Sequence, residues 1–498
     1  MKSFKNPVIP GFYPDPSVCI AGKDYYLVTS TFEYFPAVPI FHSTDLLHWT
    51  QIGHCLTRTS QVNLAGRPSS LGIFAPTIRY HEGTFYMITT DVSGAGHFFV
   101  TAKDPSGPWS DPIFVEGPGF DPDLFFDDDG KVYFSREDIT GHGIRQQEID
   151  ISTGTLIGGE RLIWDGLEDV LCEAPHIYKI DGMYYLLVAE GGTYRGHMAV
   201  IARGPNPWGP FVSCPHNPIL THRNRVLSSV QATGHGDLIQ KEDGSWWMVF
   251  LATRPVGKWH HLGRETFLAP VRWEEGWPVV NDGNEITCSD EPVYEDQVDD
   301  VTCDGQLLMP WNVRGILDPR YIKIPFSHAG VDLTPSPGRV GDTFGSAFIG
   351  RRQRSFECEL SATVTESDLK CGEEAGLTAL ANETHYYCIA LSATEEGERE
   401  VIVRRKIGTL DTVTVRKKLP RNVIAEKGLR LSIRADRRWY YLQFNDPESG
   451  ETILLDSAET RYLSTEVAGG FTGVYLGLYG SSSDESNTIV SMKEVRMQ

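Results

Sequence analysis

A degenerate repeat in the first half of the chain constrains the fold more than any other feature of the sequence. Each of five copies has a short segment marked by Pro or Gly, a turn that contains Gly or Asp, and a strand rich in aromatic residues. The anchors of the copies stand at positions 16, 76, 122, 175 and 236, and are therefore 60, 46, 53 and 61 residues apart. Short β-rich units of this length are typical of propeller blades. The repeat predicts an all-β fold with a five-bladed β-propeller, and the matching turns disfavour a pair of β-sandwiches with coincidental hairpins.

The rest of the chain indicates a second domain. A chain of 498 residues is too long for one ordinary core. We assign residues 1–300 to the propeller and residues 301–324 to a connector, because prolines and acidic residues gather around this stretch. Residues 325–498 contain short alternating segments, such as 356–360 and 401–405, which are typical of an antiparallel β-sandwich.

Composition excludes several kinds of partner. The chain has 45 Lys and Arg against 66 Asp and Glu, which gives a net charge of −21. A surface this acidic repels nucleic acid and anionic membranes, whereas a neutral sugar is compatible with it. Nine cysteines without a paired spacing argue against a disulfide framework or a zinc site. The sequence shows no signal-peptide segment and no apolar run of membrane-spanning length, so we expect a cytoplasmic protein, with its state as monomer or homo-oligomer left open.

The placement of the repeats brings polar residues together at the axis of the propeller. The innermost strand of each blade runs along the central channel. If the Pro-marked segments are innermost, their first residues ring one end of that channel. These residues are Asp15, Ala75, Asp121, Glu173 and His235. Three carboxyl groups and a histidine, far apart in the sequence, are thus predicted to converge.

Two carboxyl groups that flank a bond are the usual machinery of glycosidic cleavage. One must be protonated near neutral pH to donate to the leaving oxygen, and the other must be ionised to act as a base or a nucleophile. The pKa of a free Asp or Glu is about 4, so the pKa of the acid must be raised by burial or by a neighbouring negative charge. We predict Asp15 as the base and Glu173 as the acid, with Asp121 as the carboxylate that raises the pKa of Glu173.

Each of these residues has a structural explanation when it is taken alone. Asp before Pro is a common turn former, so Asp15 and Asp121 could simply shape turns. A lone His235 is more often a hydrogen-bonded channel residue than a ligand. Glu173 is harder to explain in this way, because it opens an apolar strand in which an unpaired charge is costly. The convergence of all four residues favours catalysis.

At these residues the chain resembles glycoside hydrolase family 43, in particular its two-domain β-xylosidases and α-L-arabinofuranosidases. The resemblance spans nearly the whole sequence, and its motifs are weak alone but specific together. They are NPVIPGFYPDPS (6–17), STFEYFP (30–36), GFDP (119–122), CEAPHIYK (172–179), AEGGT (189–193) and LGRET (262–266). The family implies a five-bladed propeller, an inverting mechanism and a lectin-like, jelly-roll β-sandwich as the C-terminal domain.

The resemblance also implies a role for each residue of the ring. The general base, the residue that tunes the acid and the general acid correspond to Asp15, Asp121 and Glu173, the same three that the repeat singles out. Arg264 is expected to bind sugar hydroxyls, or else to serve as a buried partner of Asp121. His235 matches an axial histidine that often faces a water or a calcium ion in the channel. No cofactor other than this calcium ion is expected.

Aromatic residues are expected to shape the sugar site. Phe32 resembles the aromatic wall of the family's terminal sugar subsite, and Phe74 stands where many relatives place Trp. Both are also reasonable core residues. The segment FTGVYLG (471–477) resembles a strand of the loop with which the sandwich closes the pocket in related enzymes, so Phe471 or Tyr475 is expected to act as a cap. A capped pocket makes such an enzyme exo-acting.

These inferences favour one function over several alternatives. The favoured one is an exo-acting, inverting β-1,4-xylosidase that takes small xylo-oligosaccharides and releases xylose from their non-reducing end. An α-L-arabinofuranosidase, or an enzyme with both activities, is the alternative, because the two substrates present similar pentose rings. A carbohydrate-binding propeller without catalysis is more remote, since binding does not require three clustered carboxylates. A retaining β-fructosidase-like propeller would need its carboxyl groups about 5 Å apart.

Overall fold

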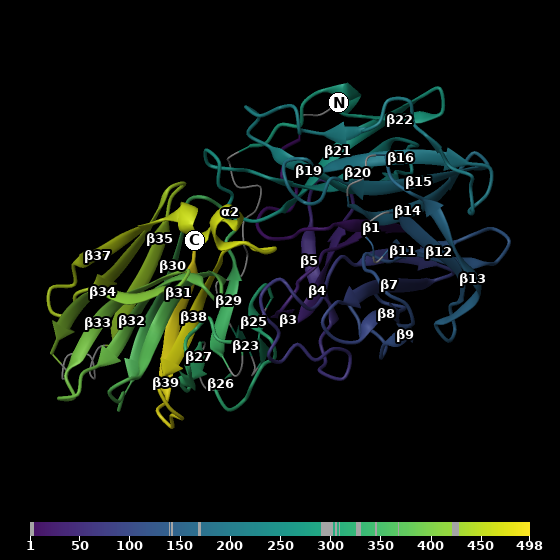
Figure 1. Ribbon diagram of the computed structural model, residues 1–498. Helices are drawn as coiled ribbons and strands as arrows, with labels where there is room; N and C mark the ends of the chain where they lie inside the picture. Colours follow the sequence, from purple (N-terminus) through teal and green to yellow (C-terminus); the bar gives the residue numbers. More distant parts are fainter. Residues whose placement is uncertain are drawn as a thin grey trace.

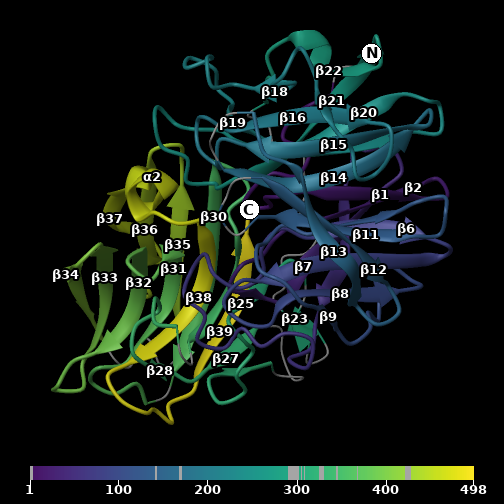
Figure 2. The ribbon, with the colours of Figure 1, turned by 45° about the vertical axis from the view of Figure 1, so that its right-hand side comes forward.

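The protein consists of two β-rich lobes, seen side by side in Figure 1 and again in the rotated view of Figure 2. The lobe coloured purple to teal is a propeller, and the lobe coloured green to yellow is a β-sandwich. The predicted all-β fold class is therefore confirmed. The computed structural model describes residues 4–138, 140, 143–167, 171–289, 302–303, 306–307, 309–324, 330–343, 346–366, 368–420 and 428–498. Within these residues no helix has the length and apolar character that a membrane crossing requires.

Five antiparallel sheets form the blades, and each follows the order of the chain. Blades one and two contain β1 (Ser17–Ala21), β2 (Asp24–Val28), β4 (Ala37–Ser43), β5 (Thr50–Leu56), β6 (Thr77–His81), β7 (Thr84–Asp91), β8 (Gly96–Ala102) and β9 (Ile113–Val115). Blade three contains β10 (Asp123–Phe126), β11 (Val132–Glu137), β12 (Ile144–Asp150) and β13 (Thr155–Trp164). Blades four and five contain β14 (Cys172–Ile180), β15 (Met183–Glu190), β16 (Met198–Gly204), β17 (Val212–Ser213), β18 (Leu220–Thr221), β19 (Gln231–Gln240), β20 (Trp246–Thr253), β21 (Glu265–Glu274) and β22 (Trp277–Val280). The five predicted repeats thus correspond to the five blades.

Turn chemistry sets the first hairpin of the blades. A Gly in this turn has a positive φ in every copy, at positions 22, 83, 130, 182 and 244. In the β6–β7 and β14–β15 hairpins the residue before the Gly, Glu82 or Asp181, is left-handed as well. Two left-handed residues make a type I′ turn, whose twist matches that of the paired strands. Glycine adopts this backbone without a Cβ clash, which explains why the repeat contains it.

The first strands of the blades close into a ring. Strand β1 lies beside β6 and β19, β10 lies beside β6 and β14, and β14 lies beside β19. The start of the chain completes blade five, because the amide groups of Val8 and Ile9 donate to the carbonyl of Thr266 at 2.9 and 3.1 Å. The Asn6 side chain exchanges two more hydrogen bonds with the backbone of Leu268, at 2.8 and 2.9 Å. The two ends of the propeller sequence are therefore held in one sheet.

Two packed sheets form the second lobe. One contains β25 (Asn312–Arg314), β28 (Ser336–Pro337), β29 (Ala347–Arg352), β31 (Glu374–Asn382), β32 (His385–Ala393), β33 (Arg399–Ile407), β34 (Leu410–Leu419) and β38 (Tyr475–Ser482). The other contains β26 (Ile322–Lys323), β27 (Val331–Leu333), β30 (Cys358–Glu366), β35 (Leu429–Ala435), β36 (Trp439–Asn445), β37 (Thr452–Glu459) and β39 (Val490–Met497). Outside the two sheets lie β23 (Thr302–Cys303), β24 (Gln306–Leu307), the 3-10 turns η1 (Asn281–Gly283) and η2 (Thr460–Leu463), and the short helix α2 (Thr465–Ala468).

A strand of the propeller sequence belongs to the sandwich. Strand β3 (Tyr34–Phe35) pairs with β25, so that Tyr34 lies opposite Arg314 and Phe35 opposite Val313. Strands β25 and β26 fall within the segment 301–324 that we predicted to be a connector. Residues 312–314 and 322–323 are therefore sandwich rather than linker, and these strands are two or three residues long, too short for an alternating pattern to reveal them.

Side chains reinforce this junction. The rings of Tyr34 and Tyr475 stack with centroids 3.8 Å apart and an interplanar angle of 9°. The Arg352 guanidinium lies over the ring of Tyr13 and donates to the carbonyl of Phe12 at 2.6 Å. Because aromatic pairs and buried charge-assisted hydrogen bonds both hold a fixed geometry, the two lobes meet as a packed interface.

Candidate active site

The residues at the start of the first strands share an unusual backbone conformation. Asp15, Asp121, Ala174 and His235 have φ values of 57, 51, 52 and 49°. Asp tolerates this left-handed region through local hydrogen bonds, whereas Ala and His pay about 1 kcal/mol or more. In blades four and five the pairing with the second strand also shifts register here. Strain that recurs at the same position of several blades marks a site that the surrounding fold enforces.

These strand starts line one pocket of about 150 Å³, which we call the inner pocket. It brings together all but one of the side chains that the sequence singled out, namely Asp15, Phe32, Phe74, Asp121, Glu173, His235, Arg264 and Phe471. Asp15 is 4% exposed and Asp121 is 6% exposed, so water reaches these carboxyl groups only through the pocket. The predicted convergence of three carboxyl groups and a histidine is therefore present in the structure.

Asp15 is held from three sides. Arg264 donates to its carboxylate with both terminal nitrogens, at 2.6 and 3.3 Å. The Ser30 hydroxyl donates to the same carboxylate, and Nδ1 of His235 lies 3.5 Å from it. Arg264 therefore pairs with Asp15, whereas the described residues show no ion pair between Arg264 and Asp121, the partner that one interpretation of the sequence allowed. A cation and a hydroxyl donor stabilise an ionised carboxylate in a fixed orientation, as a base requires.

The carboxyl groups of Glu173 and Asp121 each have a raised pKa. Burial, and then the charge of Asp15, raise the pKa of Glu173 to about 7, against the opposing effect of Arg264. Burial also raises the pKa of Asp121 well above its usual range, and the charges of Glu173 and Asp15 add to that effect. The sequence prediction named Asp121 as the cause of the shift in Glu173, whereas in the structure burial comes first and Asp15 second. The site thus contains one charge-paired carboxylate and two carboxyl groups that hold protons near neutral pH.

This difference predicts the pH dependence of turnover. The active form of a general acid is protonated, and its fraction falls about tenfold per pH unit above the pKa. Since the pKa of Glu173 is raised to about 7, we expect kcat/KM to decline above about pH 7. A pH profile on a disaccharide substrate between about pH 5 and pH 9 measures this limb. A profile that still rises at its alkaline end would remove Glu173 from the role of acid.

Four phenylalanine rings form the apolar wall of the inner pocket. Phe32 packs on Phe74 and Phe471 with centroids 5.4 and 5.6 Å apart. Phe74 also meets Phe120 at 5.6 Å and Phe471 at 5.7 Å. The predicted wall residues Phe32 and Phe74 therefore do face the site. Aromatic rings beside carboxyl groups suit the flat apolar face of a sugar ring and keep bulk water away from the acid.

The cap comes from the sandwich. The amide of Phe471 donates to Oγ of Ser70 at 2.7 Å, which ties the cap to a loop of the propeller. Gly470 beside it has a φ of 70° and lies so close to Ser70 that a Cβ would clash. Tyr475 is 0% exposed, stacks on Tyr34 and does not line the inner pocket. The prediction of Tyr475 as a pocket residue is wrong, because this side chain is used in the contact between the lobes.

Several pocket residues escaped the sequence analysis. Phe120, Leu171, Gly192, Thr193 and Tyr194 also line the inner pocket. Thr193 accepts a hydrogen bond from Arg264 at 3.1 Å. Most of these residues lie on loops, where no periodicity marks them, although AEGGT and GFDP contain three of them.

A fourth buried carboxyl group was also missed. Glu137 ends strand β11 and is 2% exposed. Burial, and then the charge of Glu173, raise the pKa of Glu137 to about 9. It is therefore a neutral neighbour of the site at neutral pH, and its position at the end of an ordinary strand gave no signal.

A second polar layer lies two to five residues further along the first strands. Arg79 of β6 donates to Asp123 of β10 at 2.7 Å and to Asp237 of β19 at 3.0 Å. Ser17 of β1 donates to Asp237 at 2.8 Å, and Tyr178 of β14 donates to it at 2.6 Å. The network therefore joins all five blades through charge-assisted hydrogen bonds. It fixes the relative positions of the strands that carry the carboxyl groups.

His235 offers little to a calcium ion. Burial lowers the pKa of His235 to about 4, so its imidazole is neutral at neutral pH. Within the described residues, no three His, Cys, Asp or Glu side chains gather closely enough to hold a metal ion. Calcium prefers six to eight oxygen ligands, and the nearby carboxylate of Asp15 is already engaged by Arg264. These residues do not fit a protein-ligated calcium site, and we derive no chemical step from one.

Two known protein families match the two lobes of the chain separately. The family model for glycosyl hydrolases family 43 matches residues 4–278, and that for the β-xylosidase C-terminal concanavalin A-like domain matches residues 304–498. The chain belongs to glycoside hydrolase family 43. Its propeller is the hydrolase domain, and its sandwich is of the lectin-like type that the sequence predicted.

Similar proteins align with this family 43 enzyme over nearly its whole length. A non-reducing end α-L-arabinofuranosidase of Bacteroides ovatus is 41% identical, covering 98% of this chain and 93% of the relative. A xylosidase/arabinosidase of Butyrivibrio fibrisolvens is 39% identical, covering 97% and 96%. The crystal structure of a xylan β-1,4-xylosidase from Bacillus halodurans superimposes with a TM-score of 0.93 at 33% identity, over 100% of each chain. The protein is accordingly a glycoside hydrolase.

Proposed function

We propose that the protein is an exo-acting, inverting β-1,4-xylosidase that releases xylose from the non-reducing end of xylo-oligosaccharides. The observation that carries this proposal is the inner pocket itself. Its volume of about 150 Å³ suits one pentose ring, and Phe471 of the sandwich forms part of its wall. A pocket that holds only the terminal sugar next to an acid and a base cleaves one residue at a time.

The proposed reaction is a single displacement. Glu173, protonated near neutral pH because its pKa is raised, donates its proton to the glycosidic oxygen. Asp15, paired with Arg264, takes a proton from the water that attacks the anomeric carbon from the opposite face. Asp121 holds its own proton and gives the site a third hydrogen-bonding carboxyl group. These side chains supply all the chemistry, so we propose that no cofactor is required.

An α-L-arabinofuranosidase, or an enzyme with both activities, is the second candidate. It is favoured by the arabinofuranosidase of Bacteroides ovatus, 41% identical, and by the xylosidase/arabinosidase of Butyrivibrio fibrisolvens. The xylosidase is favoured by the full-length superposition on the Bacillus halodurans enzyme. The same apolar and carboxyl walls suit either sugar, because a xylopyranose and an arabinofuranose are both pentoses with similar hydroxyl patterns.

Parallel assays test the proposal. We expect xylobiose to be hydrolysed, and a nitrophenyl β-xyloside to have a higher kcat/KM than a nitrophenyl α-L-arabinofuranoside. Proton NMR of the first minutes should show α-xylose before mutarotation, because inversion of a β-bond gives the α-anomer. A higher kcat/KM for the arabinofuranoside would move the assignment to the second candidate. The β-anomer as first product would replace the inverting mechanism by a retaining one.

A further inference from the structure

A second, larger pocket opens beside the inner one. It has a volume of about 370 Å³, and we call it the outer pocket. The two pockets share Thr193, Tyr194, Arg264 and Phe471 as lining residues, so they are neighbouring parts of one opening. In an enzyme that holds the terminal sugar in the inner pocket, the part of the substrate that departs must lie here.

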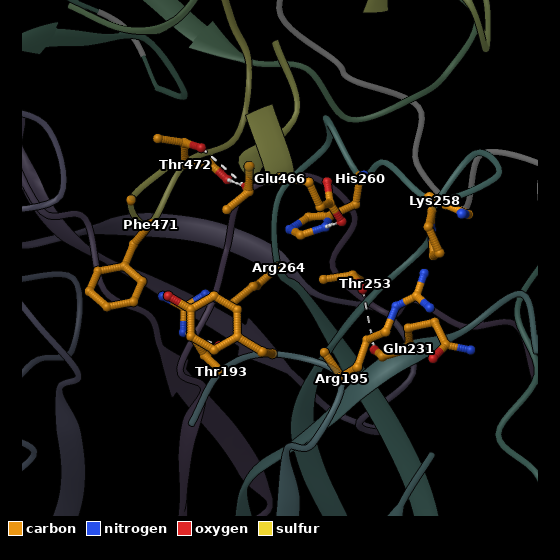
Figure 3. A pocket seen from close by; sticks show the side chains of 15 residues that line it. Thr193, Arg195, Gln231, Thr253, Lys258, His260, Arg264, Glu466, Phe471 and Thr472 are labelled. Atoms are coloured by element: carbon orange, nitrogen blue, oxygen red, sulfur yellow. Dashed lines mark hydrogen bonds and ion pairs between the residues drawn. The ribbon is translucent and has the colours of Figure 1, made fainter. Parts of the chain in front are cut away.

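On the side of the sandwich, polar side chains that line the outer pocket are hydrogen-bonded to one another. Glu466 of helix α2 accepts hydrogen bonds from Nδ1 of His260 at 2.7 Å and from the His260 amide at 2.9 Å. The hydroxyl groups of Thr465 and Thr472 pair with each other at 3.1 Å. Figure 3 shows the pair of His260 and Glu466. The polar side chains of this wall are therefore engaged with one another.

Two cations on the remaining wall of the outer pocket have no carboxylate partner among the described residues. Lys258 and Arg195 line the outer pocket, and Figure 3 shows their side chains across it from Phe471. In the described part of the chain, neither forms an ion pair with a carboxylate, whereas Arg264 in the same pocket is paired with Asp15. The whole protein carries a net charge of −21, and yet no carboxylate of the described residues is paired with either of these two cations. A local positive potential in an acidic protein selects an anionic ligand.

We propose that the outer pocket is a leaving-group subsite for an acidic sugar. The carboxylate of a uronic acid residue, in the part of the substrate that departs after cleavage, is bound by Lys258 and Arg195. The planar guanidinium suits bidentate contact with a carboxylate, and the lysine supplies a second point charge. This inference rests on the proposed function, because it presupposes that a pentose occupies the inner pocket. It adds that the preferred oligosaccharide is charged.

The experiment compares two aryl pentosides, one with a charged and one with a neutral leaving group, and follows their ratio across variants. One carries a 4-carboxyphenyl leaving group and the other its neutral methyl ester, on the pentose that the enzyme hydrolyses. The measured quantity is the ratio of kcat/KM for the acid to that for the ester. We expect this ratio to fall about fivefold in Lys258→Gln and in Arg195→Gln, and more than tenfold in the double variant, as the loss of exposed charge pairs at about 4 Å implies. Added 0.5 M NaCl, about five times typical assay salt, should lower the wild-type ratio and leave that of the double variant unchanged.

Matched variants keep the test specific. Lys258→Arg and Arg195→Lys retain the charge and should retain most of the ratio. Lys23→Gln removes the same charge from the turn between β1 and β2, at the other end of blade one from Asp15, and should leave the ratio unchanged. A ratio that is the same within about twofold in the wild type and the double variant would overturn the acidic-sugar subsite. Failure of the proposed function would instead appear as no turnover of the neutral ester by the wild type.

Discussion

Glu173→Gln should lose hydrolysis of xylobiose by about a thousandfold or more while it keeps most of its activity on a dinitrophenyl xyloside. The reason is that an alcohol leaving group needs the proton that Glu173 holds, with its pKa raised to about 7. A dinitrophenolate departs without protonation. Steady-state kinetics give kcat/KM on each substrate, and the loss relative to the wild type is compared between the two.

A matched variant controls for general damage to the propeller. Glu82→Gln makes the same change in the β6–β7 turn, where the side chain is exposed, and should behave like the wild type on both substrates. Circular dichroism and thermal unfolding establish that each variant is folded. If Glu173→Gln lost both substrates equally, the residue would not be the acid, and full activity on xylobiose would eliminate it from the reaction.

Asp15→Asn should be inactive on both substrates, with a loss of about ten-thousandfold. An amide cannot accept the proton of the attacking water, and a good leaving group does not replace that step. The substitution also removes the charge that Arg264 and Ser30 hold in place. The same pair of assays therefore distinguishes the roles of the two carboxyl groups. The loss of activity in Glu173→Gln depends on the leaving group, whereas the loss in Asp15→Asn does not.

The control for Asp15 uses another aspartate in a turn. Asp243→Asn lies in the β19–β20 hairpin, where its side-chain oxygen accepts from the amide of Ser245 at 3.0 Å, a bond that Asn preserves. We expect wild-type activity from it. Turnover by Asp15→Asn within tenfold of the wild type would mean that another group activates water.

The repeat made the propeller and its ring of carboxyl groups predictable from sequence. Each blade can be recognised from its local sequence, because it has a Gly at positive φ in the first turn and aromatic residues in the second strand. Once the first strands are aligned on an axis, Asp15, Asp121 and Glu173 must converge, whatever their separation in the chain. The family resemblance then assigned their roles.

The features that escaped prediction depend on non-local contacts. Strand β3 finds its partner β25 almost 280 residues away, and neither strand is long enough to carry a pattern. The choice between Phe471 and Tyr475 as the cap could not be made, because both are aromatic and β38 is buried along its whole length. Likewise, Glu137 continues a buried strand whose residues are all inaccessible, so nothing distinguished it from core.

The closure of blade five bears on the order in which the protein becomes competent during synthesis. Asn6 and Ile9 have no sheet partner until Thr266 and Leu268 have left the ribosome, so the propeller remains an open ring until then. Strand β3 waits longer, for Val313, and the inner pocket lacks a wall until Phe471 emerges. A nascent chain therefore carries all three of its carboxyl groups long before it can hold a sugar between them. The inner pocket is complete only when Phe471 of the sandwich is in place.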